Sequence, residues 1–195
     1  MTQVTVSELI GQLEAAYDAH PTGVLASDGD FTIWDGDIGE ALFEAALEGD
    51  LLRDEARAAL CREAVAAGVV GAGELSPREL GLSLYAAYRD GRYTELDVCC
   101  TMAWAFAGYR HDELAALCDE VLDRFGFEAR VRPEMRQVLD WATARQVRFF
   151  LVSASPLAVV DAAARRLGVP IAGTVAMTPA TEGDVLLARL GLDAT

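Results

Sequence analysis

Apolar residues recur at helical spacing over most of this chain. The first such stretch predicts a helix that begins after Thr5 and ends near His20. Thr5 and Glu8 fit a capping box at its start. From Asp37 to about Arg130 the pattern predicts one helix after another, without any strand signal. This long block is therefore expected to form an all-helical unit.

Three short apolar runs interrupt the helical pattern and predict strands. They follow Gly23, span residues 147–152 and span residues 171–177, and amphipathic helical stretches separate the second run from its neighbours. Helices that alternate with strands indicate a parallel sheet. We therefore predict an α/β fold with a Rossmann-like parallel sheet core and an inserted all-helical cap. The expected parts are 1–36 (N-terminal helix and first part of the core), 37–130 (cap) and 131–195 (second part of the core).

Charge and composition exclude some partners. The net charge is −15, and all 16 basic residues are arginine. Because no basic stripe is available to neutralise phosphates, we expect no nucleic-acid partner. The longest near-apolar stretch, 98–108, is shorter than a membrane span, and the N-terminus does not resemble a signal peptide. We expect a cytoplasmic protein without a membrane partner, in which Cys61, Cys99, Cys100 and Cys118 are buried, reduced thiols.

Candidate chemistry gathers where two predicted strands end. Asp28 and Asp30 follow the first strand, and Ser153 lies at the end of the second, just before a new helix. Closely spaced aspartates are common in surface turns and at helix starts. Here, however, the carboxyl ends of parallel strands form the edge where ligands bind. One carboxylate can act as a nucleophile while the other transfers protons.

These residues, in this order and with a helical insertion between them, resemble the haloacid dehalogenase superfamily of phosphatases, in particular its phosphoserine-phosphatase-like branch. The resemblance implies that Asp28 attacks phosphorus to form an aspartyl-phosphate and that Asp30 protonates the leaving alcohol and then activates water. It further implies that the Asp28 carboxylate and the Asp30 backbone carbonyl hold Mg²⁺, that Ser153 binds the phosphoryl group and that Thr32 orients the loop. The expected cofactor is Mg²⁺, and the expected substrate is a small phosphorylated metabolite.

Some residues have two interpretations. Asp37 stands where phosphoserine phosphatases carry a glutamate that meets the substrate's amino group, but it also fits the N-cap of the next helix. Ser155 fits an N-cap better than a ligand. Arg165 and Arg166 fit the last turn of a helix, where they complement its dipole. His20 and His111 are expected at the surface.

The sequence also departs from the family pattern. The family requires a basic residue, usually lysine, and a later acidic motif, but this chain has no lysine. Residues 182–185 resemble the helix start where that lysine would lie, with Asp184 in its place and Arg189 as an unconvincing substitute. Phe31 replaces a common glycine, which is tolerated if its φ is negative.

These departures predict a truncated or degenerate hydrolase that lacks its last strands. Its first strand would then have an open edge, which favours a homo-oligomer. We consequently expect a Mg²⁺-dependent phosphomonoester hydrolase. One alternative is a catalytically impaired domain that binds a phosphate ligand or a partner, and another is a phosphotransferase.

Overall fold

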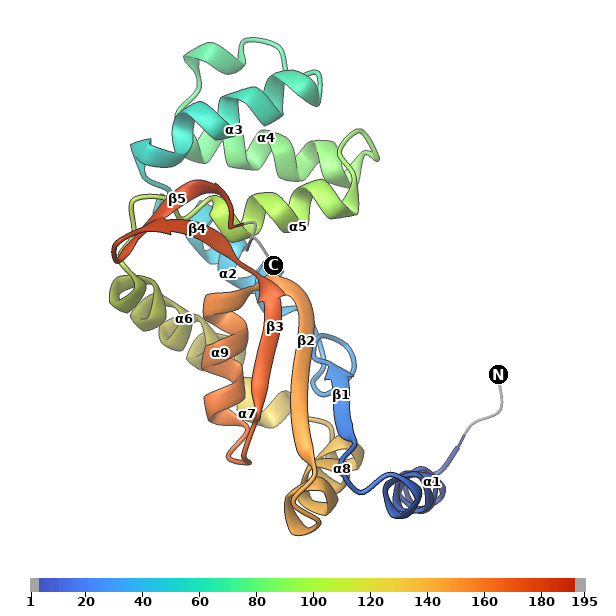
Figure 1. The fold of residues 1–195 in the computed structure, drawn as a ribbon. Helices are drawn as coiled ribbons and strands as arrows, with labels where there is room; N and C mark the ends of the chain where they lie inside the picture. The colour runs from blue at the N-terminus through green and yellow to red at the C-terminus, as the bar shows by residue number, and fades with distance from the viewer. Residues whose placement is uncertain (1–3, 192–195) are drawn as a thin grey trace.

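A parallel sheet of three strands forms the centre of the computed structural model, which describes residues 4–191. The strands are β1 (Val24–Asp28), β2 (Arg148–Pro156) and β3 (Gly173–Met177), in the order β1-β2-β3 (Figure 1). Asp28 pairs with Val152, which pairs in turn with Val175. The predicted parallel α/β architecture is thus confirmed. Residues 1–3 of the first predicted part and residues 192–195 of the last lie outside the described residues.

Four of the described helices begin at a residue whose side chain caps them. Thr5 and Glu8 form a capping box at α1 (Val6–Ala19), and Ser76 and Glu79 form another at α4 (Pro77–Arg89). The other helices between β1 and β2 are α2 (Ile38–Glu48), α3 (Asp54–Ala66), the 3₁₀ helix η1 (Ala72–Glu74), α5 (Glu95–Trp104), α6 (His111–Phe125), α7 (Phe127–Arg130) and α8 (Pro133–Ala144). Figure 1 shows α3, α4 and α5 beyond the carboxyl ends of the strands. The domain boundaries themselves stay a prediction.

The two faces of the sheet differ in burial. Phe149 and Leu151 of β2 are buried on the face that packs against α2 and α9 (Leu157–Arg166). On the opposite face Val24, Val152 and Val175 are exposed. Within residues 4–191, β1 pairs with β2 alone, so its other edge is open, as expected.

A hairpin replaces the expected helix start at residues 182–185. The strands β4 (Pro179–Glu182) and β5 (Val185–Leu190) pair antiparallel around a turn in which Gly183 has a φ of +60°. Glycine adopts this conformation without a steric cost, and a two-residue turn of this kind favours a hairpin. The prediction of a helix start was therefore wrong, and Asp184 lies in a turn.

Side-chain burial corrects one further expectation. Cys118 is buried as expected, but Cys61, Cys99 and Cys100 are only half-buried, because their helices also face solvent or a cavity. His20 and His111 are exposed, as predicted. Arg165 and Arg166 lie in the last turn of α9, as predicted, and Arg166 also forms ion pairs with acidic residues of α6 and α7. Over residues 4–191, no helix combines the length and the apolar character needed to span a bilayer.

Candidate active site

A tight loop after β1 presents Asp28. The backbone N–H groups of Thr32, Ile33 and Trp34 all donate hydrogen bonds to the Gly29 carbonyl, at 3.1, 2.8 and 3.3 Å. A Cβ on Gly29 would lie 2.4 Å from the Trp34 ring, so this position requires glycine. Asp28 itself is exposed, and the Thr32 hydroxyl donates a hydrogen bond of 3.0 Å to its Oδ2. Thr32 therefore orients the Asp28 carboxylate through Oδ2, while the side chain as a whole stays exposed.

Phe31 adopts a conformation that the sequence did not predict. Its φ is +55°, in the left-handed region, rather than negative. This conformation costs a non-glycine residue about 1–2 kcal/mol. The Phe31 N–H donates a hydrogen bond of 3.2 Å to the Gly36 carbonyl, which closes the loop and offsets part of that cost.

Asp30 is held in place by four hydrogen bonds. The Trp34 indole Nε1–H and the Ile38 backbone N–H each donate to Oδ1 at 2.9 Å. The hydroxyls of Ser153 and Ser155 donate to Oδ2, at 3.1 and 2.7 Å. Both carboxylate oxygens thus have partners, and these partners come from the loop, the start of α2 and the end of β2.

The structure brings Ser153 to this site, as the sequence predicted, but Ser155 has another role than expected. β2 continues to Pro156, and Pro156 is the N-cap of α9, so the prediction that Ser155 caps this helix was wrong. Its backbone N–H instead donates to the Ser153 hydroxyl at 3.0 Å. A Cβ on Gly39 would lie 2.5 Å from the Ser155 Oγ, so α2 can approach the two serines only because it has glycine there.

A cavity of about 370 Å³ lies between this loop and the helices above it. Among the residues that line it are Asp28 and Asp30 from the core and Tyr88, Glu95 and Cys99 from α4 and α5. Ser153 and Thr32 are not among the lining residues but form hydrogen bonds with Asp30 and Asp28, respectively. No residue that lines the cavity is basic. The site therefore combines the exposed carboxylate of Asp28 and the fixed carboxylate of Asp30 with an acidic wall.

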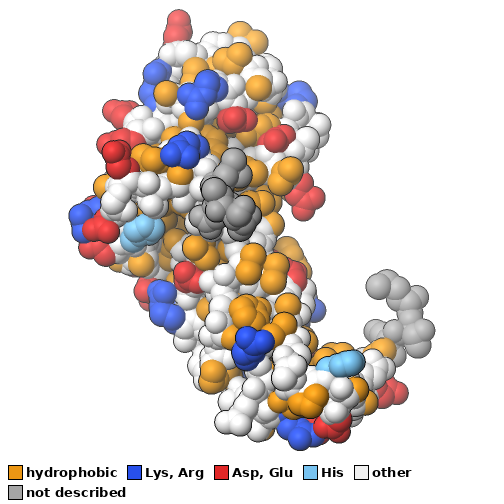
Figure 2. Space-filling view, viewed as in Figure 1, with side chains coloured by type: hydrophobic (Ala, Val, Ile, Leu, Met, Phe, Trp, Pro, Cys, Tyr) orange, Lys and Arg blue, Asp and Glu red, His pale blue; other side chains and the backbone are white. Residues whose placement is uncertain are grey.

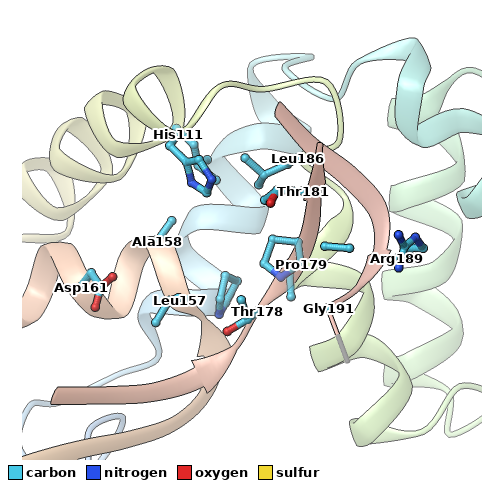
Figure 3. Close-up of a pocket in the computed structure, with 14 residues that line it drawn as sticks. His111, Leu157, Ala158, Asp161, Thr178, Pro179, Thr181, Leu186, Arg189 and Gly191 are labelled. Carbon is cyan, nitrogen blue, oxygen red and sulfur yellow. The ribbon is translucent and has the colours of Figure 1, made fainter. Parts of the chain in front are cut away.

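A second cavity of about 450 Å³ lies between α6, α9 and the β4–β5 hairpin (Figure 3). Its charged or titratable lining residues are His111, Asp161 and Arg189. Figure 3 shows Asp161 and Arg189 on opposite sides of it, so these side chains do not converge on one point. The smaller cavity, which holds the paired aspartates, is the better candidate for catalysis.

Asp37 fits both interpretations that the sequence allows, a helix N-cap and a residue of the candidate site. It is the N-cap of α2, where its Oδ1 accepts a hydrogen bond of 2.8 Å from the Glu40 N–H, and it also lines the cavity. Burial raises the pKa of Asp37 to about 6, and the negative charge of Asp30 adds to this shift. Burial and the charges of Glu44 and Asp30 likewise raise the pKa of Glu40. The cavity wall is therefore short of positive charge.

The raised pKa of Asp37 makes the stability of the fold depend on pH. Because ionisation is disfavoured in the folded state, stability falls as the pH rises from the ordinary value of 3.8 through about 6. Asp37→Asn keeps an N-cap side chain but cannot ionise. Discounted for its partial exposure, we expect this variant to gain about 1–2 kcal/mol relative to the wild type between pH 4 and pH 8.

Thermal unfolding at pH 4 and pH 8, with a chelator present, measures this difference. Asp140→Asn is the matched control, because Asp140 is exposed on α8. We expect the melting temperature of that control to follow the wild type at both pH values. A difference between wild type and Asp37→Asn that is the same at pH 4 and pH 8 would contradict the assignment.

The oxygen ligands available at the site suit only a metal ion that takes few ligands from the protein. Among residues 4–191, no group of three or more histidine, cysteine or acidic side chains is arranged to hold a metal. The Asp30 carboxylate already has four hydrogen-bond donors, which leaves the Asp28 carboxylate and backbone carbonyls. Mg²⁺ usually keeps several waters and takes only one or two carboxylates. These residues therefore fit Mg²⁺ but not a metal that needs a full set of protein ligands.

Sequence reasoning missed Trp34, Tyr88 and Glu95. Trp34 is fully buried and packs edge-on against Phe127, with ring centroids 5.1 Å apart, while its indole N–H binds Asp30. Its place four residues after Asp30 was the one available indication. Tyr88 and Glu95 reach the cavity through the packing of α4 and α5, and no local pattern marks them.

Comparisons with known proteins indicate the family and the fold. A family model described as haloacid dehalogenase-like hydrolase matches residues 25–192. No curated protein matches the sequence. A protein of unknown function from Bordetella pertussis Tohama I has a similar structure, with a TM-score of 0.57, 21% identity and coverage of 87% of this chain and 66% of its own.

Two further solved structures are similar. One is a HAD family hydrolase from Salmonella enterica serovar Typhi, with a TM-score of 0.50, 12% identity and coverage of 95% of this chain and 55% of its own. The other is a cytosolic 5'-nucleotidase IIIB bound to cytidine, with a TM-score of 0.50, 13% identity and coverage of 95% and 58%. At these identities the likeness concerns the fold alone. The chain spans between 55% and 66% of the length of these three structures.

Proposed function

We propose that this chain, which belongs to the haloacid dehalogenase-like hydrolase family, is a Mg²⁺-dependent phosphomonoester hydrolase. Its substrate would be a small phosphorylated metabolite. The observation that carries this proposal is the exposed Asp28 carboxylate at the end of β1, oriented by Thr32 beside the fixed Asp30 and facing a cavity. Parallel α/β sheets bind ligands at this edge.

In the proposed reaction Asp28 is the nucleophile. Its Oδ1, which Thr32 leaves without a hydrogen bond, forms a bond to phosphorus while the bond between phosphorus and the leaving alcohol oxygen breaks, and Asp30 gives its proton to that leaving oxygen. In the second step Asp30 takes a proton from the water that attacks the aspartyl-phosphate. A protonated Asp30 needs an acceptor, and the hydroxyls of Ser153 and Ser155 can rotate to accept instead of donating.

Mg²⁺ would be held by the Asp28 carboxylate and the Asp30 backbone carbonyl. When bound, it supplies positive charge that stabilises the phosphoryl oxygens. This charge matters here because no basic residue lines the cavity and the chain has no lysine.

The same lack of positive charge lowers the expected turnover and in this way supports a second candidate function. A domain with this site but little turnover would act as a module that binds a phosphate ligand or a partner. Loss of one preorganised electrostatic stabiliser removes about 10²–10³ in rate. The two functions therefore differ in turnover rather than in binding.

Hydrolysis of p-nitrophenyl phosphate by the purified chain tests the proposal. We expect phosphate release that requires Mg²⁺ and stops when a chelator is added. An added alcohol should leave the yield of free phosphate unchanged, because water is the acceptor; phosphate transfer to the alcohol would show a phosphotransferase instead. Saturable binding of inorganic phosphate without any turnover would overturn the hydrolase in favour of the binding module.

A further inference from the structure

The face of the sheet opposite α2 and α9 lies open. Val24, Val152 and Val175, one from each strand, are 51%, 41% and 59% exposed, and Phe150 between them is half-buried. Figure 2, in the same view as Figure 1, shows hydrophobic side chains gathered over these strands. Parallel sheets are normally covered on both faces, and a contiguous exposed apolar patch marks an interaction site.

Opposite charges lie at the two ends of this open face. Arg148 begins β2 and pairs with Val24, whereas Asp28 ends β1 and pairs with Val152. Because side chains alternate along a strand, Arg148, Val152 and Asp28 share the open face, and all three are exposed. Four residues, about 13 Å, separate the two charged positions along the strands. Within the described part of the chain, Arg148 forms no ion pair.

We propose that a second copy of this chain covers the open face, with its strands antiparallel to those of the first. A two-fold axis between the sheets then places Arg148 of each copy over the carboxyl end of the other sheet, near the partner subunit's Asp28. Face-to-face sheets pack about 10 Å apart, a gap that a long arginine side chain and an aspartate together bridge. The parallel arrangement would instead bring like charges together at both ends.

The consequence for catalysis rests on the proposed function. No residue that lines the Asp28 cavity is basic, and the chain has no lysine. In the antiparallel dimer, Arg148 of one subunit supplies a guanidinium beside the partner subunit's Asp28. Guanidinium groups bind phosphoryl oxygens well, so the dimer completes a phosphate site that one copy leaves acidic.

Net charge and area limit the affinity. Each copy carries a net charge of −15, so the two copies repel each other, and this repulsion is screened beyond about 8 Å at 0.15 M salt. A three-stranded face is also smaller than the roughly 800 Å² per partner of a typical stable interface. We therefore expect a dissociation constant in the micromolar range, to be measured at 0.15 M salt.

Sedimentation velocity over a concentration series tests the interface without any assay of activity. We expect Val152→Glu and Val175→Glu each to raise the dimer dissociation constant at least tenfold; both side chains are exposed, so the fold should persist. Val70→Glu is the matched control, since Val70 is 96% exposed outside the sheet, and it should leave the constant unchanged. A chain that stays monomeric at high micromolar concentration, or a dimer insensitive to both sheet substitutions, overturns the proposal.

A charge exchange tests the orientation. Arg148→Asp and Asp28→Arg should each weaken the dimer, and the double variant should restore it, because the opposite charges then face each other again. If the double variant is weaker than either single variant, the antiparallel pairing is wrong.

Subunit mixing connects the interface to the site. Asp28→Asn removes the nucleophile and Arg148→Ala removes the guanidinium, so each dimer alone should be nearly inactive. In an equal mixture at least half of the dimers are mixed, because only the mixed dimer keeps one Arg148–Asp28 pair. One of its two sites is intact, so at least about one quarter of wild-type activity should return when the chains are fully dimeric. Additive activities in the mixture overturn the shared site. A dimer that passes the sedimentation tests but hydrolyses no phosphate ester refutes the proposed function and leaves the interface standing.

Discussion

Asp28→Asn should lower the Mg²⁺-dependent hydrolysis of an aryl phosphate by at least about 10³-fold, or to the uncatalysed background. The amide cannot form the aspartyl-phosphate, and it removes the negative charge that attracts the metal ion. Its oxygen can still accept the hydrogen bond that the Thr32 hydroxyl donates at 3.0 Å, so the loop should keep its shape. The measurement is kcat/KM at one fixed Mg²⁺ concentration.

Asp140→Asn is the control, because it removes an exposed carboxylate on α8 and leaves the site unchanged. It should retain full activity, and the melting temperatures of both variants should stay close to that of the wild type. Equal rates for wild type and Asp28→Asn would show that another group does the chemistry and would end the nucleophile assignment.

The main elements were predictable because their signals are local. The capping boxes at Thr5 and Ser76 lie within four residues of the helices they start, and the alternation of helix and strand after Pro133 defines a parallel sheet. The positions of Asp28 and Ser153 at one sheet edge follow from the same topology, since parallel strands end on the same side.

The predictions were wrong where contacts between residues far apart in the sequence decide between two local structures. Ser155 before a proline looks like a helix cap, but pairing with β3 extends β2 to Pro156, and the Ser155 hydroxyl bonds to Asp30 instead. Gly183 and Asp184 fit a helix start as well as a turn, and the pairing of β4 with β5 decides for the turn. Phe31 takes a positive φ because the loop closes onto Gly36.

The residues that α4 and α5 contribute to the site could not be predicted, for the same reason. Tyr88 lies in the last turn of α4 and Glu95 begins α5, and each has an ordinary local role there. Only the packing of α4 and α5 over the β1 loop brings them to the cavity with Asp37. The acidic residues of this wall come from the β1 loop, the start of α2 and the start of α5, so no local sequence pattern marks the lack of positive charge at the site.

Asp30→Ala should destabilise the fold by about 3–4 kcal/mol. The substitution leaves the indole N–H of Trp34 and the backbone N–H of Ile38 without an acceptor, and both residues are fully buried. Each unsatisfied buried donor costs about 1–3 kcal/mol. For a chain of 195 residues this corresponds to a fall of about 6–16 °C in melting temperature.

Asp30→Asn separates this structural role from the chemical one. The amide oxygen can still accept from Trp34 and Ile38, and its NH₂ group can donate to the hydroxyls of Ser153 and Ser155 once they rotate. We expect a stability loss of only about 1 kcal/mol, but a loss of activity of about 10²–10⁴ because the amide cannot carry the proton. Thermal unfolding and phosphate release on both variants measure the two effects. If Asp30→Ala is as stable as Asp30→Asn, the four hydrogen bonds do not hold the loop; if Asp30→Asn keeps its activity, Asp30 is a positioning residue and the proton moves by another route.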